Sequence, residues 1–166
     1  MPYRKKLIKD LIVLAKKEGI ERFVVGGVII KHRKVLILQR SKNDFMGGVH
    51  EIPSGKIEQG ETIEDALKRE IKEETGLDIS KILYYISSFD YISGSGKKTR
   101  QFNFWVETEN SGVKLSQEHT NFAFVGESEL NSYNITEEVR KIIKIVLHSM
   151  GAISNCDKKT YNLSDF

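Results

Sequence analysis

The sequence has 166 residues and a mass of 19.0 kDa, which suits one domain of ordinary size. Hydrophobic residues make up 39% of the chain and charged residues 30%, so there is enough apolar material for a core and wholesale disorder is excluded. The net charge of +3 is too small to argue for or against a nucleic-acid partner. The function must therefore depend on a local site.

Cysteine usage and hydropathy narrow the class of protein further. Cys156 is the single cysteine, which excludes an internal disulfide and a thiolate metal cluster. No run of residues reaches the roughly 18 consecutive apolar side chains that a membrane span needs. Lysines interrupt the N-terminal segment every few residues, unlike the apolar core of a secretory signal. We therefore expect a soluble, cytoplasmic protein with no membrane partner.

The first elements are a helix and a hairpin. Leucine and isoleucine recur at three- and four-residue spacing among lysines over residues 3–17, which predicts an amphipathic helix ending at Gly19. Residues 22–30 and 35–39 are rich in β-branched and aliphatic side chains and are separated by a short polar turn, so we expect a β-hairpin. A loop with two glycines follows over residues 41–48.

The next elements are a second helix and two longer strands. Thr62 is a good N-cap and Gly76 a good C-terminal stop, so the spacing predicts a helix over residues 63–75. Residues 82–92 and 100–108 have strand character and are joined by a basic, glycine-rich connection. These segments predict two longer strands.

The C-terminal part of the chain predicts one more strand and a packing helix. The strand lies near residues 122–125, and apolar side chains recur on one face of residues 137–150 after the possible cap Thr136. We expect residues 1–150 to form a single domain. Residues 151–166 lack periodicity and are mostly polar, so we expect a loosely held tail.

The helix over residues 63–75 has an unusual charge pattern. At about 100° per residue, Glu70, Glu73 and Glu74 fall along the apolar stripe, while the lysines fall opposite it. Carboxylates that converge inward repel one another and lose hydration, unless a cation is present. Hard oxygen donors favour Mg²⁺ or Mn²⁺, and Mg²⁺ favours a phosphate-bearing substrate. On spacing alone, the alternative of solvated glutamates that pair with lysines stays open.

Residues 55–77 resemble the Nudix box, G-x5-E-x7-R-E-U-x-E-E-x-G-U, in which U is aliphatic, and every specified position is present. The order of strands and helices over residues 22–150 is also similar to that family. The resemblance implies an α/β protein with the Nudix fold, an α/β/α sandwich around a mixed β-sheet. It also implies a pyrophosphohydrolase that requires Mg²⁺, or Mn²⁺ in its place, and cleaves a nucleoside diphosphate linked to another moiety by water attack on phosphorus.

The resemblance assigns roles to residues of the box. It implies these metal ligands: the backbone carbonyl of Gly55 and the carboxylates of Glu70, Glu73 and Glu74. Arg69 is expected to orient the glutamates, and Glu61 to tie the loop to the helix through Arg69. All of these residues except Gly55 and Glu61 are candidates for the catalytic set.

Two residues outside the box complete the candidate site. Family members take their general base either from the position of Glu70 or from a later loop, where Glu118 is the candidate, and both alternatives stay open. Arg40 follows the second hairpin strand, where similar proteins often place a basic residue against the substrate phosphates. The alternative for Arg40 is a solvated side chain at the end of a strand.

Aromatic and histidine side chains offer weaker signals. Alternating aromatic residues usually belong to the core, so we expect at most two aromatic side chains to contact a base or ribose. Loop histidines are usually polar surface. The candidates are Phe45, Phe89, Tyr91, Phe102, Phe104, His50 and His119.

The substrate stays open between several classes. Residues 50–54, which lead into the box, are closer to those of some nucleotide-sugar members than to the Pro-Gly-Gly of many triphosphatases. The alternatives are an ADP-ribose or capped-RNA hydrolase and a non-catalytic nucleotide-binding module. The basic helix over residues 4–17 suggests RNA, but its lysines suit a solvated face equally well. We expect a nucleotide-derived small molecule as the partner rather than a nucleic acid, and a monomer or homodimer.

Overall fold

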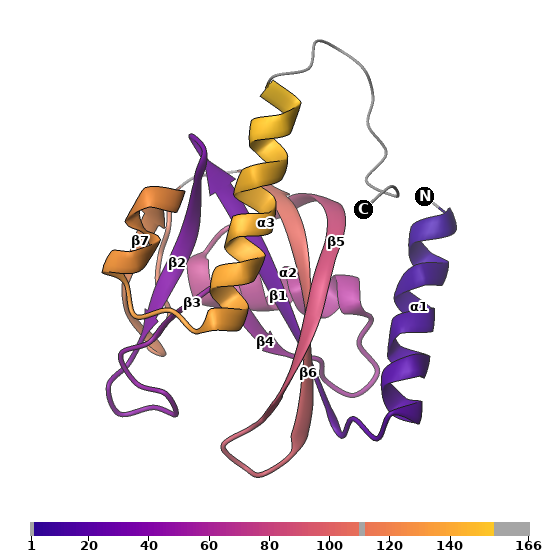
Figure 1. Cartoon of the computed structure of the whole chain (residues 1–166). Coiled ribbons are helices and arrows are strands. Elements are labelled where there is room, and N and C mark those ends of the chain that lie inside the picture. Colours follow the sequence, from indigo (N-terminus) through magenta and orange to yellow (C-terminus); the bar gives the residue numbers. More distant parts are fainter. Residues whose placement is uncertain (1, 110–111, 155–166) are drawn as a thin grey trace.

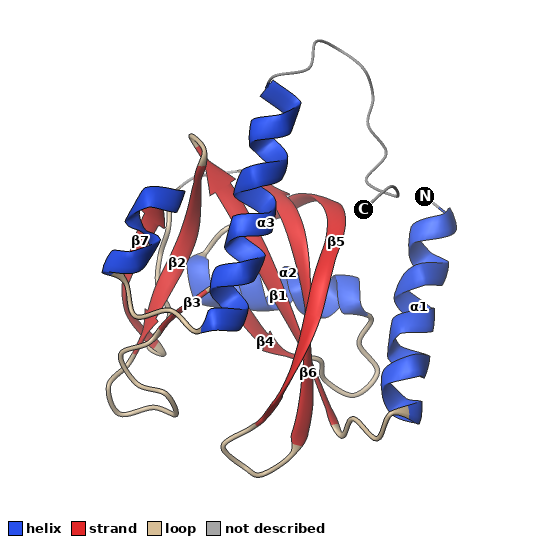
Figure 2. Ribbon diagram, in the orientation of Figure 1, coloured by secondary structure: helices blue, strands red, loops and turns tan. Residues whose placement is uncertain are grey.

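The protein is a mixed β-sheet with helices on both of its faces, as Figure 1 and Figure 2 show. The computed structural model describes residues 2–109 and 112–154. The elements are α1 (Pro2–Lys17), β1 (Arg22–Lys31), β2 (Lys34–Arg40), β3 (His50–Glu51), β4 (Ser54–Lys56), α2 (Ile63–Thr75), β5 (Ile79–Ile92), β6 (Lys98–Thr108), β7 (His119–Val125), the 3₁₀ helix η1 (Glu127–Ser132) and α3 (Glu137–Ser154). No helix within the described ranges combines the length and apolar composition that crossing a bilayer demands.

Strand β1 is the centre of the sheet. The described residues form a 7-stranded sheet in the order β3-β2-β1-β6-β5, with β4 paired to β1 and β7 paired to β2. The pairing of β1 with β6 is parallel and the other pairings are antiparallel. Because β4 pairs with residues 24–26 of β1, it brings the start of the Nudix-like segment against the middle of the sheet.

Alternating side chains of the sheet fill a core on each face. Val25 and Ile29 of β1 pack with α1 and α2, whereas Val28 packs with η1 and α3. The first core also contains Ala15, Leu36, Leu38, Ala66, Leu67, Ile71, Phe102 and Phe104. The second contains Val35, Ile37, Ile52, Leu130, Val139, Ile142, Ile143 and Val146. The two cores confirm the expected α/β/α sandwich around a mixed sheet.

The end of α1 is tied to the hairpin formed by β5 and β6. Arg100 donates from Nη1 to Glu18 at 2.5 Å, and from Nε and Nη2 to the two carboxylate oxygens of Asp90 at 2.6 and 2.8 Å. Only 17% of the Arg100 side chain is exposed. These contacts hold α1 beside the hairpin, as seen in Figure 1.

Several sequence predictions are confirmed at residue level. Helix α2 begins and ends where the caps predict: the hydroxyl of Thr62 accepts the N–H of Asp65 at 3.1 Å, and Gly76 has a left-handed φ of 70°. The hairpin of β1 and β2 is present, with a turn in which His32 and Arg33 have positive φ. Helix α1 is also where the periodicity places it.

Three strands begin earlier than predicted. β5 starts at Ile79, β6 at Lys98 and β7 at His119. The register of β5 against β6 shifts at several points, and such bulges break the alternation of side chains on which the prediction depends. The short elements β3, β4 and η1 were not predicted, because two- or three-residue strands leave no periodic pattern.

The final helix is longer than predicted. Periodicity ended it at Met150, whereas α3 continues through Ser154, so the expected boundary of the C-terminal tail was wrong by one helical turn. Gly151 lowered the predicted helix length because glycine disfavours helix interiors. The remainder of the predicted tail, residues 155–166, lies outside the described residues.

Candidate active site

An open cleft of about 670 Å³ lies over the sheet on the face covered by α3. Two groups of lining residues differ in chemistry. We call Arg40, Glu51, Ser54, Gly55 and Glu118 the acidic half. We call Arg22, Phe45, Phe89, Tyr91 and Gln101 the aromatic half. Strand β1 separates them, because β4 lies against one of its edges and β6, followed by β5, against the other.

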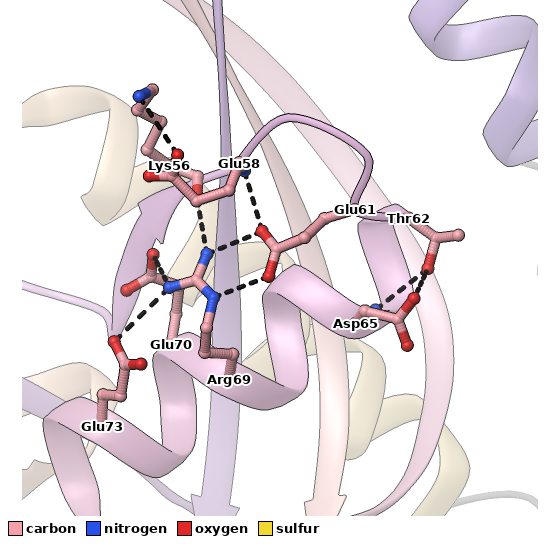
Figure 3. Close-up of polar contacts among 8 residues, drawn as sticks. All are labelled: Lys56, Glu58, Glu61, Thr62, Asp65, Arg69, Glu70 and Glu73. Atoms are coloured by element: carbon pink, nitrogen blue, oxygen red, sulfur yellow. Dashed lines mark hydrogen bonds and ion pairs between the residues drawn. The ribbon is translucent and has the colours of Figure 1, made fainter.

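Arg69 binds the loop before α2 to the helix, as Figure 3 shows. Its Nε and Nη2 donate to the two carboxylate oxygens of Glu61 at 2.7 and 2.8 Å, and Nη2 also donates to the carbonyl of Lys56 at 2.9 Å. The bonds from Arg69, together with the N–H of Glu58 at 2.8 Å from Oε2, lower the pKa of Glu61 to about 2. The pairing of Glu61 with Arg69 that the resemblance implies is therefore present.

Glu70 is pressed against the backbone of Gly55. A Cβ atom at residue 55 would overlap the carboxyl group of Glu70, so only glycine fits there. Arg69 Nη1 donates to Glu70 Oε1 at 2.7 Å, yet burial raises the pKa of Glu70 because desolvation outweighs the guanidinium. The contact brings together two groups that the sequence placed at one metal site.

Glu74 is the most deeply buried carboxylate of the site, with 5% of the residue exposed. Its Oε2 accepts the N–H of Ser54 at 2.8 Å, and no cationic side chain of the described residues forms an ion pair with it. Burial, reinforced by the charges of Glu51, Glu70 and Glu118, raises its pKa to about 9. A divalent cation would offset this negative charge, and the donors are all oxygens, so the residues present fit Mg²⁺ or Mn²⁺.

Glu73 does not converge inward, so that part of the helical-wheel prediction was wrong. Its side chain is 59% exposed, and its one ion pair within the described part of the chain is with Arg69 Nη1, at 3.4 Å. Glu73 falls at the edge of the apolar stripe, where neither core covers the helix. Among residues 2–109 and 112–154, no three acidic, histidine or cysteine side chains are already gathered at metal-binding distance. Arg69 instead lies between Glu70 and Glu73.

Arg40 lies in the wall of the cleft, but its guanidinium is occupied by protein partners. Nη1 donates to Glu51 at 2.8 Å, Nη2 to Asp44 at 2.6 Å, and Nε to the carbonyl of Phe45 at 2.8 Å. These bonds fix the loop over residues 41–48 against the end of β2. The predicted contact with substrate phosphates has no counterpart in this arrangement.

Glu51 is a cleft residue that the sequence analysis did not place in the site. Its Oε1 accepts from Arg40 and lies 3.1 Å from Nε2 of His119, which must donate because a carboxylate only accepts. The His119 side chain is fully buried, so it is not a loop surface group. The position of Glu51 two residues before Pro53, just ahead of the box, was the available signal.

Glu118 is exposed in the loop before β7 and lines the acidic half. Its carbonyl accepts the N–H of Ser41 at 2.9 Å, which anchors this loop to the loop over residues 41–48. The aromatic candidates divide in two. Phe102 and Phe104 are core residues with 1% exposure, whereas Phe45, Phe89 and Tyr91 line the cleft, together with His50.

The chain is similar to known proteins in sequence and in fold. The model of the NUDIX domain matches residues 21–145. An 8-oxo-dGTP diphosphatase of Proteus vulgaris is 48% identical over 59 residues, which are 35% of this chain and 53% of that protein. An ADP-ribose pyrophosphatase of Methanocaldococcus jannaschii is 43% identical over 76 residues, covering 45% of this chain and 44% of that protein. The chain thus spans about half the length of these curated relatives.

Solved structures give the same fold at low sequence identity. The crystal structure of a MutT NUDIX hydrolase from Burkholderia pseudomallei superposes with a TM-score of 0.67 and 21% identity, covering 75% of this chain and 97% of that one. A MutT protein from Methanosarcina mazei Go1 has a TM-score of 0.68 and 22% identity, with 78% and 94% covered. Because the domain model matches most of the chain and the box residues lie together in the structure, the chain belongs to the Nudix family.

Proposed function

We propose that this protein is a metal-dependent pyrophosphohydrolase that cleaves a nucleoside diphosphate linked to another moiety. The observation that carries the proposal is the buried carboxylate of Glu74, which lies beside Glu70 and Gly55 without a cationic partner among the described residues. Such a group is stable as an anion only if a cation joins it. The adjoining open cleft is large enough for a nucleotide.

The metal would be held by the carbonyl of Gly55 and by Glu70, Glu73 and Glu74. When bound, Mg²⁺ or Mn²⁺ supplies positive charge to the phosphate oxygens as the bond between phosphorus and the leaving oxygen weakens. Glu61 holds Arg69, and Arg69 in turn holds Glu70. The side chain of Glu73 is exposed and has freedom to turn toward the site.

The reaction needs a residue that removes a proton from water. Water attacks phosphorus, the phosphoanhydride P–O bond breaks, and the leaving phosphate oxygen takes up the electron pair. Glu118 is the better placed of the two candidate bases, because it is exposed on the cleft wall, while Glu70 is held by Arg69 and packed on Gly55. Glu118 therefore accepts the proton of the attacking water in this proposal.

The cleft and the names of the relatives support two candidate substrate classes. Arg40 is engaged by Glu51 and Asp44, so in this proposal it positions the loop over residues 41–48 rather than binding phosphate. Nucleoside triphosphates are the first candidates, in line with the names of the 8-oxo-dGTP diphosphatases. ADP-ribose is the second candidate, because the Methanocaldococcus jannaschii relative is named for it.

A substrate panel tests the proposal directly. Nucleoside triphosphates, ADP-ribose, sugar nucleotides and dinucleoside polyphosphates would be incubated with Mg²⁺, with Mn²⁺ and with chelator, and the products followed by phosphorus NMR in ¹⁸O-labelled water. We expect metal-dependent release of a phosphate-containing fragment with one ¹⁸O incorporated at phosphorus. Glu70→Gln and Glu118→Gln should lower turnover.

The control is Glu64→Gln, since Glu64 lies in the first turn of the same helix and, among the described residues, is not one of the carboxylates that pair with Arg69. Hydrolysis that survives chelation, or equal losses in Glu64→Gln and Glu70→Gln, would overturn the assignment. Binding of nucleotides without any turnover would instead identify a non-catalytic module.

A further inference from the structure

The cations that line the cleft differ in how they are paired. Arg40 pairs with Glu51 and Asp44, and Lys56 lies 3.5 Å from Glu58. Arg22, at the start of β1, donates from Nη2 to the neutral hydroxyl of Ser95 at 3.0 Å, and no carboxylate of the described chain lies within ion-pair distance of it. A guanidinium without a carboxylate has donors to offer a ligand.

A buried amide pair lies next to it in the floor of the cleft. Asn103 has no exposed surface, and its Nδ2 donates to the carbonyls of Ser87 at 3.2 Å and Gln101 at 3.3 Å. Its Oδ1 must therefore face Gln101, whose Nε2 donates to it at 2.9 Å. This network fixes the orientation of the Gln101 carboxamide, and it leaves Oε1 as an acceptor for which the described residues supply no donor.

Gly26 of β1 leaves room for the side-chain amides of Gln101 and Asn103. A Cβ atom at Gly26 would stand 2.6 Å from Asn103 Oδ1 and 2.7 Å from Gln101 Nε2, closer than any side chain allows. Glycine at this position lets the two carboxamides lie directly on the strand. The acceptor of Gln101 is thus held rigidly at the cleft floor.

The surroundings of Arg22 and Gln101 suit a planar ring. Gln101 of β6 pairs with Phe89 of β5. Thr99 of β6 pairs with Arg22 on one side and with Tyr91 on the other. The rings of Phe89 and Tyr91 are 5.9 Å apart, and Phe45, with 49% exposure, faces the same space from the opposite loop. Aromatic side chains of this kind stack on nucleobases.

The spacing also fits a nucleotide that spans both halves of the cleft. Gly55 pairs with Val25, so Arg22 lies three residues, or roughly 10 Å, further along β1. A base near Arg22 therefore leaves the phosphates of the same nucleotide within reach of the acidic half.

We propose that Arg22 and Gln101 read the edge of the nucleobase and select a purine that carries an oxygen at C6 and an unprotonated N7. This inference rests on the proposed function. Arg22 donates to the adjacent acceptors O6 and N7, the pair that arginine recognises in guanine. Gln101 Oε1 accepts the N1–H of the same base.

The chemistry excludes two close relatives of guanine. Adenine presents an amino group at C6 and an acceptor at N1. Its amino group would therefore face the donors of Arg22, and its N1 would face the acceptor Oε1 of Gln101. An 8-oxoguanine base carries hydrogen on N7, which leaves Arg22 a single acceptor there. The preferred substrate is then an undamaged 6-oxopurine nucleotide, even though several relatives are named for 8-oxo-dGTP.

Binding of mononucleotides tests the inference without turnover. Calorimetric titration of the wild-type chain with GMP, IMP, AMP, 8-oxo-GMP, 7-deaza-GMP and 1-methyl-GMP separates the contacts one by one. We expect GMP and IMP to bind about tenfold to a hundredfold more tightly than AMP. Removing N7 weakens only the Arg22 contact, and methylating N1 weakens only the Gln101 contact.

Variants then locate the effect on Arg22. Arg22→Met keeps an unbranched aliphatic side chain and removes the guanidinium donors. The only hydrogen bond of the Arg22 side chain among the described residues is the exposed one to Ser95, and a melting curve checks that the variant is folded. The affinity gap between GMP and AMP should shrink about tenfold or more, and 7-deazaguanine should no longer be distinguished from guanine. Lys81→Met, which removes an exposed charge outside the described cleft lining, should leave the gap intact.

Each outcome decides the inference separately from the proposed function. Equal affinity of the wild-type chain for GMP and AMP would overturn it, even if hydrolysis of nucleotides is observed. A loss in Arg22→Met that follows the number of phosphates rather than the base would overturn it in favour of an anion site. Base selection that depends on Arg22 in a chain without hydrolysis would uphold it and refute the catalytic proposal.

Discussion

A glutamate lies near each end of α2, and the pKa values of the two glutamates are shifted in opposite directions. Just before α2, both carboxylate oxygens of Glu61 accept hydrogen bonds from the Arg69 guanidinium, and the pKa of Glu61 falls to about 2. At the last turn, Glu74 is buried with one backbone N–H as its partner, and its pKa rises to about 9. Partners and burial set these values, since both groups are glutamates on one continuous segment.

This contrast distinguishes the residues that hold the box together from the residues that we propose to bind a metal. The Glu61–Arg69 end is a satisfied polar network that holds the loop to the helix. At the Glu70–Glu74 end, burial raises the pKa of both carboxyl groups, so a bound cation would favour their charged forms. Changes at the two ends should therefore have different kinds of effect.

The largest effect on activity is expected from Glu74→Gln. Gln keeps the volume and can still accept from Ser54, but it removes the buried charge, so turnover with Mg²⁺ should fall about a hundredfold to a thousandfold. At neutral pH and without metal, melting should be unchanged or higher, because a carboxyl whose pKa is raised to about 9 must take up a proton on folding, whereas Gln needs none. Initial rates and calorimetric melting measure the two effects. Unchanged turnover, with folding intact, would contradict the site.

A mixed effect on activity and stability is expected from Arg69→Met. The change removes the guanidinium donors of Glu61 and of the Lys56 carbonyl, leaves Glu61 with the N–H of Glu58, and frees Glu70 to move. We expect kcat/KM to fall about tenfold to a hundredfold, with a raised requirement for metal, as for other residues that orient metal ligands. The melting temperature should fall by about 5 °C. Metal titrations of the rate distinguish this from a simple loss of fold.

A smaller, pH-dependent effect belongs to Glu61. Its folded-state pKa lies below the ordinary value of 4.5, so its stabilising contribution is complete above pH 4.5 and is lost as the pH falls toward about 2. The melting temperature of Glu61→Gln should therefore lie below that of the wild type at neutral pH, and the two should converge through this window. A constant difference across the same pH range would show that the ion pair is not responsible.

The smallest effect is expected from Arg40→Gln. Its partners Asp44, Glu51 and the carbonyl of Phe45 hold the loop over residues 41–48, so its loss should loosen the cleft wall without removing a metal ligand. We expect KM to rise a few-fold while kcat changes little. If Arg40 instead binds the reacting phosphates, kcat should fall strongly, and steady-state kinetics on one substrate distinguishes the two roles.

Local signals predicted both ends of α2. The cap at Thr62, the stop at Gly76 and the 3.6-residue period are all contained within α2 or next to it, so the sequence was enough to set both ends. The box also identified Glu61, Arg69, Glu70 and Glu74 as candidate site residues from local sequence alone. Their spacing is fixed by one helix and one short loop.

Long-range pairing decided the parts that the sequence did not predict. Glu51 enters the cleft because β3 pairs with β2, and His119 is buried because β7 pairs with β2 on its other side. The exposure of Glu73 depends on where the core ends, which a helical wheel does not contain. The ion pairs of Arg40 likewise join residues whose proximity only the folded loop creates.

The close contact between Gly55 and Glu70 has a consequence for variation of the chain. A single methyl group at position 55 would displace the carboxyl group of Glu70 without adding or removing a charged side chain. Adding a Cβ atom at Gly55 displaces the Glu70 carboxyl group by sterics alone. Gly55→Ala therefore isolates the geometry of the site from its electrostatics.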